Sequence, residues 1–118
     1  MANLLTMKDK VLLVPFPFDD LSGDKVHPVV CLSDPIGVHR HVVVAFVTSR
    51  VPVPLLATDL VIAPSDDGFG VTGLRKVSTL RLHRLMTVAT TTVLRELGEL
   101  PMQMQEQVRN KLALLFDL

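Results

Sequence analysis

Residues 11–33 constrain the fold of this chain more than any other segment. An apolar run at residues 11–18 meets a polar turn at residues 19–25, and a second apolar run covers residues 29–32. Two short β-type runs around a turn that contains a glycine are typical of a β-hairpin. The sequence therefore predicts two neighbouring strands joined by a polar loop.

Two prolines decide how the first of these strands ends. Pro15 and Pro17 have no backbone N–H, so the strand must end, bulge or lie at a sheet edge beside them. The connecting loop is then free to project from the sheet. We expect it to bring Lys25 and His27 to one rim.

The chain continues with short strands. Residues 41–50 form a continuous β-branched run, which favours a central strand buried on both faces, and residues 59–64 read as another short strand. The glycine-rich residues 65–73 read as the most flexible loop. They lead into a long β-rich stretch at residues 74–93, which we expect to be broken in the middle.

A helix is predicted after Pro101, where apolar residues recur at three- and four-residue steps and so share one helical face. These residues are Met104, Val108, Leu112, Leu115 and Phe116. Strands followed by one helix predict a small twisted antiparallel barrel that the helix closes. The length of 118 residues fits a single domain, 1–118.

Cysteine usage and hydropathy indicate the compartment. The single Cys31 lies in an apolar run, which favours a buried thiol in a reducing compartment. The N-terminus has no basic start, and no apolar run approaches the roughly 20 residues that span a bilayer. We therefore expect a cytoplasmic protein without membrane contact.

Charge is balanced in total but not along the chain. Twelve Lys and Arg match twelve Asp and Glu, which by itself argues against a nucleic-acid binder. No acid lies between Asp67 and Glu96, an interval that contains Arg75, Lys76, Arg81, His83, Arg84 and Arg95. This interval is either a phosphate-binding surface or a solvated strand face whose acids lie across the sheet.

Four ordered segments carry a family resemblance. They read VPFPFDDLSG followed by HPVVCLS, then VVVAFVTSR, then TGLRKVSTLRL, and finally RELGEL. Together they resemble the PemK/MazF family of toxins of type II toxin–antitoxin systems, from about residue 9 to the C-terminus. The resemblance implies a mainly β fold with a C-terminal helix, the SH3-like small β-barrel of the PemK/MazF/CcdB toxin type.

The resemblance also implies an activity and partners. It implies a sequence-specific endoribonuclease that cuts single-stranded RNA without a metal or cofactor, through attack of the ribose 2′-hydroxyl that leaves a 2′,3′-cyclic phosphate. This chemistry needs a base, donors to the phosphorane oxygens and an acid for the departing 5′-oxygen. A homodimer, a cognate antitoxin, and operator DNA bound only by the toxin–antitoxin complex are implied as well.

The resemblance places the chemistry at two positions. His27 stands before Pro28, where many members have an arginine, and Thr48 matches a catalytic threonine at the end of the central strand. Histidine can transfer protons near neutral pH, whereas arginine stays charged and forks two donors onto a phosphate. RNA or phosphate contacts are expected from Lys25, Ser49, Arg50, Phe69, Lys76, Ser78 and Arg81.

Strand alternation limits which basic residues can act together. His83 and Arg84 also fall on positions that line the RNA groove in relatives. Lys76 and Ser78 share one face by alternation, while Arg81 and His83 share the other. Only a β-bulge would let all of them face one groove.

Two further readings of the whole protein stay open. In the first, His27 is only a turn-exit residue of a non-cleaving relative that binds antitoxin and operator DNA. In the second, the protein is a DNA gyrase poison of the same fold. Apolar Leu115, Phe116 and Leu118 at the end of the helix favour packing over gyrase docking.

Four side chains have a plain structural alternative. Thr48 can be a β-branched strand residue bonded to nearby backbone. Phe69 lies between two glycines and either stacks on a base or packs on the core. His39 and His41 share a strand face, yet no third metal ligand stands at a telling spacing, so no metal site is predicted.

Overall fold

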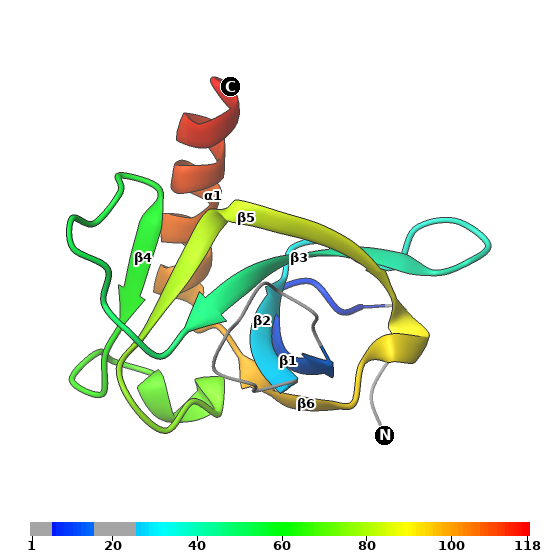
Figure 1. Cartoon of the computed structure of the whole chain (residues 1–118), viewed down its shortest axis with the longest axis horizontal. Helices are drawn as coiled ribbons and strands as arrows, with labels where there is room; N and C mark the ends of the chain where they lie inside the picture. The colour runs from blue at the N-terminus through cyan, green and yellow to red at the C-terminus, as the bar shows by residue number, and fades with distance from the viewer. Residues whose placement is uncertain (1–5, 16–25) are drawn as a thin grey trace.

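The computed structural model describes residues 6–15 and 26–118. Within these residues the strands form one curled antiparallel sheet of six strands in the order β4-β5-β3-β2-β1-β6 (Figure 1). The strands are β1 (Lys10–Pro15), β2 (Val26–Cys31), β3 (His41–Thr48), β4 (Asp59–Ile62), β5 (Ser78–Ala89) and β6 (Arg95–Glu99). Two short 3₁₀ turns, η1 (Phe69–Thr72) and η2 (Thr90–Thr92), precede β5 and β6, and the helix α1 (Met102–Phe116) follows. The predicted mainly β fold with a C-terminal helix is confirmed.

The central strands bury both of their faces. Alternate residues point to opposite sides of a sheet, so Ala45 and Val47 of β3 enter one apolar cluster while Val42 and Val44 enter another. The helix-side cluster comprises Val11, Val30, Ala45, Val47, Leu60, Ile62, Leu80, Leu82, Leu100, Met104 and Val108. The inner cluster comprises Met7, Leu12, Val14, Val29, Cys31, Val42 and Val44.

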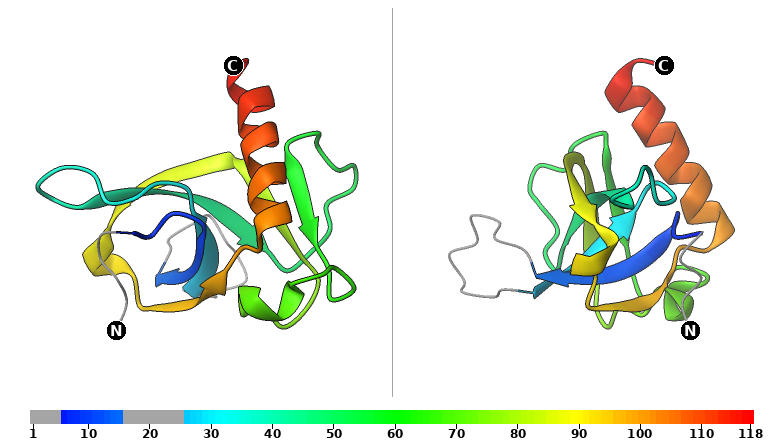
Figure 2. Two further views of the ribbon diagram at one scale, coloured as in Figure 1. Left: turned by 180° about the vertical axis from the view of Figure 1, so that it is seen from behind. Right: turned by 90° about the vertical axis from the view of Figure 1, so that its right-hand side faces the viewer.

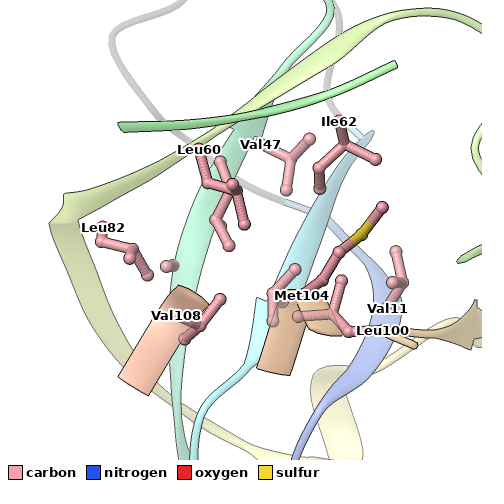
Figure 3. Packing of buried hydrophobic residues seen from close by; sticks show 11 residues of the cluster. Val11, Val47, Leu60, Ile62, Leu82, Leu100, Met104 and Val108 are labelled. Atoms are coloured by element: carbon pink, nitrogen blue, oxygen red, sulfur yellow. The ribbon is translucent and has the colours of Figure 1, made fainter. Parts of the chain in front are cut away.

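Helix α1 covers one face of the sheet through its first half. Met104 and Val108 point from the helix into the helix-side cluster, beside Leu60 and Ile62 of β4 (Figure 3). Full burial of side chains of this size contributes about 1.5–3 kcal/mol each. The predicted helical face is therefore correct as far as Leu112, which is half-buried.

The end of the helix differs from the prediction. Phe116 and Leu118 are 55% and 93% exposed, and Leu114 is 59% exposed. The helix runs beyond the sheet (Figure 2), so none of the six described strands lies opposite its last turn. The expectation that the apolar helix end is packed is therefore wrong for Phe116 and Leu118, and the argument against gyrase docking that rested on it fails.

Several strand boundaries also differ. β2 begins at Val26 and not at residue 29, which brings His27 into the sheet, and β3 ends at Thr48. β5 is continuous over its 12 residues, so the expected break is a shift of register against β3 and not an interruption of the strand. β6 was not predicted, because its sequence RELGE lacks an apolar alternation. The expected strand end at residues 16–18 and the turn at residues 19–25 lie outside the described residues.

None of the described helices is both long and apolar enough to cross a membrane.

Two glycines let η1 lie directly against β6. A Cβ on Gly98 of β6 would overlap the backbone of Val71 and Thr72, and a Cβ on Gly73 would overlap the carbonyl of Leu97. Gly73 also has a φ of +76°, which side-chain-bearing residues rarely adopt. This backbone contact ties the loop before β5 to the outer strand of the sheet.

We predict that Gly98→Ala destabilises the fold by about 1–3 kcal/mol, the usual cost of forcing an extra methyl group into close packing. Urea unfolding measures the change as a lower midpoint. Gly70→Ala is the matched control, because a Cβ at Gly70 meets nothing within 4 Å. Equal midpoints for both variants would contradict the close contact.

Candidate active site

His27 lies near the start of β2, opposite Val14 of β1. It shares the sheet face of Val29 and is only 8% exposed. The next pair along the two strands, Pro15 and Val26, is exposed. His27 therefore sits at the rim of the inner cluster, where the sheet opens to solvent.

Thr48 reaches the same face from β3. β2 and β3 pair as far as Val29 and Phe46, and by strand alternation His27 lies on the face of Val29 while Thr48 lies on the face of Phe46. The two predicted catalytic residues thus come from neighbouring strands and face the same way.

The hydroxyl of Thr48 has a defined partner. Its Oγ1 accepts a hydrogen bond from the backbone N–H of Arg50 at 3.3 Å. A hydroxyl that accepts one bond still has its own proton to donate. Thr79, which pairs with Thr48, donates its hydroxyl to the carbonyl of Arg50 at 2.7 Å, so the turn after β3 is held from two sides.

Phe46 joins the site, although the sequence did not single it out. Its ring lies 5.4 Å from the imidazole of His27, centroid to centroid, in an edge-to-face arrangement at 61°. The guanidinium carbon of Arg84 lies 4.7 Å from the centroid of the same ring. The signal in the sequence was that Phe46 stands two residues before Thr48 in the same strand, so both point to the same face.

A bulge in β5 brings Arg84 to this place. Ala45 pairs with Leu85, but the next residue, Phe46, pairs with Arg81. Residues 82–84 therefore lie between the two registers. β-bulges are frequent next to active sites, where they change the direction of a side chain.

Arg81 has a structural partner. Its Nε donates to Oδ1 of Asp59 at 3.0 Å, and the carboxylate of Asp59 is fully buried. Oδ2 of Asp59 also accepts the N–H of Leu56 at 2.9 Å. Removing one partner of a buried ion pair is strongly destabilising, so the ion pair gives Arg81 a role in the fold, whereas phosphate binding by Arg81 stays a prediction.

The other residues that were predicted to contact phosphate differ in solvent exposure. Ser49, Arg50 and Lys76 are exposed. Ser78 is 4% exposed, and its hydroxyl donates to the carbonyl of Lys76 at 3.0 Å. The exposed residues can meet a ligand directly, whereas Ser78 supports the backbone before β5.

Two more residues were predicted to contact RNA, Phe69 and Lys25. Phe69 is half-buried in η1 and packs against the helix-side cluster, so the structure supports its packing alternative. Base stacking by Phe69 stays a prediction. Lys25 lies outside the described residues.

The single cysteine is buried in the inner cluster. Burial raises the pKa of Cys31 to about 11, and its thiol donates to the carbonyl of Ser33 at 3.1 Å. A thiol with such a pKa is a poor nucleophile at neutral pH. Among the described residues no three His, Cys, Asp or Glu side chains are grouped as a metal site needs.

The site therefore combines an imidazole, a hydroxyl and a guanidinium on one face of the sheet. A model of the PemK-like, MazF-like toxins of type II toxin–antitoxin systems matches residues 8–116. The chain belongs to this family. PemK/MazF toxins are endoribonucleases, which agrees with the resemblance carried by the four sequence segments.

Solved structures show the same fold. An endoribonuclease from a mycobacterial species, in complex with its cognate antitoxin, superimposes with a TM-score of 0.68 at 19% identity over 96% of each chain. The Mycobacterium tuberculosis toxin MazF-mt6 gives 0.68 at 23% identity, over 92% of this chain and 97% of that one. A MazE-MazF structure from Deinococcus radiodurans gives 0.67 at 17% identity over 95% of each chain. A search of the curated proteins found no match.

Proposed function

We propose that this PemK/MazF toxin is itself an endoribonuclease that cuts single-stranded cytoplasmic RNA at a short sequence, without a metal. The observation that carries the proposal is the placement of His27 and Thr48 on one face of the sheet, at a rim. Family membership supplies the reaction class. The products would carry a 2′,3′-cyclic phosphate and a 5′-hydroxyl.

The residues divide the work of this reaction. The ribose 2′-oxygen forms a bond to phosphorus while the bond from phosphorus to the 5′-oxygen breaks, so one proton leaves the 2′-hydroxyl and one reaches the 5′-oxygen. His27 is the proton-transfer group, since imidazole accepts and donates protons near neutral pH. The hydroxyl proton of Thr48 is the donor to a non-bridging oxygen, because Oγ1 already accepts the N–H of Arg50.

Exposed groups around this face would hold the RNA strand. Ser49, Arg50 and Lys76 follow or precede strands that reach the site and are solvent-exposed. Cations on such a surface bind phosphates largely by electrostatic attraction, which weakens as salt rises. Phosphate or base contacts by Ser78, Phe69 and Arg81 belong to the same proposal, as does a phosphate contact by Lys25, which lies outside the described residues.

The apolar helix end is proposed as part of a homodimer interface. Leu114, Phe116 and Leu118 are exposed together at the end of α1. The loop that carries exposed Leu55 is tied to this helix, since Lys111 donates to the carbonyl of Ala57 at 3.0 Å. A second copy would cover these apolar side chains, as interfaces of homodimers are more apolar than the remaining surface.

An antitoxin is the proposed protein partner, because two of the similar structures are toxins crystallised with one. Operator DNA would be bound only by the toxin–antitoxin complex.

One observation favours the non-cleaving reading. His27 is 8% exposed and contacts Phe46, so it also serves as a packing residue at the edge of the inner cluster. A protein that only binds antitoxin would keep this packing and lack turnover. The two readings differ in whether RNA is cut.

We expect purified protein to cut long single-stranded RNA at discrete positions in the presence of a chelator. Thr48→Ala should reduce the rate at least about 100-fold, the usual loss when one donor to a transition-state oxygen is removed. Primer extension maps the cuts, and Thr87→Ala, an exposed threonine on β5, is the control. Folded protein that leaves RNA intact across a range of pH would support the non-cleaving reading instead.

We expect His27→Ala to reduce cleavage by about 100-fold or more, because a positioned acid or base usually contributes that factor. His27→Arg should retain cleavage, because a guanidinium stabilises charge on the phosphate oxygens. Single-turnover rates between pH 5 and 9 measure both effects. An unchanged rate in His27→Ala would remove His27 from the mechanism.

We expect the protein to sediment as a dimer and the double variant Leu114→Asp/Phe116→Asp to sediment as a monomer, because buried charges at an apolar interface are costly. Asn110→Asp adds a charge at an exposed position of the same helix and should leave the dimer intact. Sedimentation of the double variant as a dimer would place the interface elsewhere.

A further inference from the structure

One aromatic ring contacts two of the charged or titratable groups on the active face. The ring of Phe46 lies 5.4 Å from the imidazole of His27 and 4.7 Å from the guanidinium carbon of Arg84. Phe46 is half-buried in β3, two residues before Thr48, and so points to the same side. The three strands β2, β3 and β5 each contribute one member of this group.

The backbone is arranged so that Arg84 reaches the ring. In the outer part of the β3–β5 pair, Val44 faces Met86 and Ala45 faces Leu85, and this register continued by one residue would oppose Phe46 and Arg84. The observed partner of Phe46 is instead Arg81, after the bulge. Leu82 and Leu85 both pack with the helix-side cluster, and Arg84 lies over the ring on the other side.

The contacts have a clear physical basis. A guanidinium over an aromatic face is attracted by the ring quadrupole, most strongly where water is partly excluded. An edge-to-face contact likewise restrains the orientation of the imidazole. Because Phe46 has only two side-chain torsions and is anchored in a central strand, it is a firmer support than either of the two side chains alone.

The proposed reaction needs a fixed positive charge near His27. His27 replaces the arginine expected from the family resemblance, so it can transfer a proton but does not present a permanent, forked charge. The phosphorane oxygens still need such a charge. Arg81, the nearest alternative along the strand, donates to the buried carboxylate of Asp59.

We propose that Phe46 is a positioning residue, which holds Arg84 beside His27 so that Arg84 supplies the fixed positive charge and His27 is left to transfer protons. This inference rests on the proposed ribonuclease function. Arg84 would present a guanidinium edge to a non-bridging phosphate oxygen while its plane stays on the ring. Phe46 itself touches neither the RNA nor the reacting atoms.

Phe46→Leu tests the support, because it removes the ring and keeps an apolar side chain. We expect kcat to fall roughly tenfold, the factor that corresponds to a cation–π contact of ordinary strength, with KM little changed. Phe46→Trp retains an aromatic face and should restore most of kcat. Val88→Ala trims a half-buried neighbour of the inner cluster without touching the ring, and controls for lost stability.

Arg84→Gln tests the charge. It should lower kcat more than Phe46→Leu does, and the double variant should fall no more than about threefold below Arg84→Gln alone, because the ring acts through Arg84. The ring-current shift of the His27 imidazole protons, read by NMR at a fixed pH, should vanish in Phe46→Leu and persist in Val88→Ala. That readout does not depend on RNA cleavage.

The outcomes distinguish a failure of the proposed ribonuclease function from a failure of the positioning role of Phe46. Wild-type protein that cuts no RNA would overturn the proposed function. If wild-type protein cuts RNA, two results would overturn the positioning role alone. One is a kcat of Phe46→Leu equal to that of wild type, and the other is fully additive losses in the double variant. A loss of kcat in Phe46→Leu that Phe46→Trp reverses, with a non-additive double variant, would support it.

Discussion

The two-sided burial of β3 is the constraint on which the other features depend. Its alternate residues enter the helix-side and inner clusters, so a shift by one residue would exchange every side chain between the two. That constraint fixes the register against β2 and therefore the sheet face that His27 and Thr48 share. Against β5 the register of β3 changes between Ala45 and Phe46, and the bulge there brings Arg84 over Phe46.

His27 is almost fully buried, yet it lies next to solvent-exposed residues. A polar ring at 8% exposure must be supported by its neighbours, because an unsupported buried polar group costs free energy. The contact with Phe46 is part of that support, and the exposed pair of Pro15 and Val26 leaves the ring close to solvent. A residue deeper in the inner cluster would be better packed, but it would be farther from solvent.

Sequence patterns predicted the elements better than their mutual placement. The β1–β2 hairpin, the central strand and the helical face through Leu112 follow from local periodicity and turn residues, and the structure contains all three. Phe46 could not be recognised, because its importance arises from a bulge in another strand, 36 residues later in the chain at Leu82. The exposed helix end was missed for a similar reason, since periodicity shows which residues share a face but not where the sheet beneath them ends.

The same limit applies to the cationic interval between Asp67 and Glu96. A count of charges treats Arg81 and Arg84 alike, yet one donates to the buried Asp59 and the other lies on an aromatic ring beside a predicted catalytic residue. The two arginines have different partners because the bulge in β5 lies between them. Arg81 is opposite Phe46 in the β3–β5 pair and opposite Asp59 in the β4–β5 pair. A protein with no net charge can therefore place its arginines in different surroundings, because one arginine pairs with the buried Asp59 and another lies over the ring of Phe46.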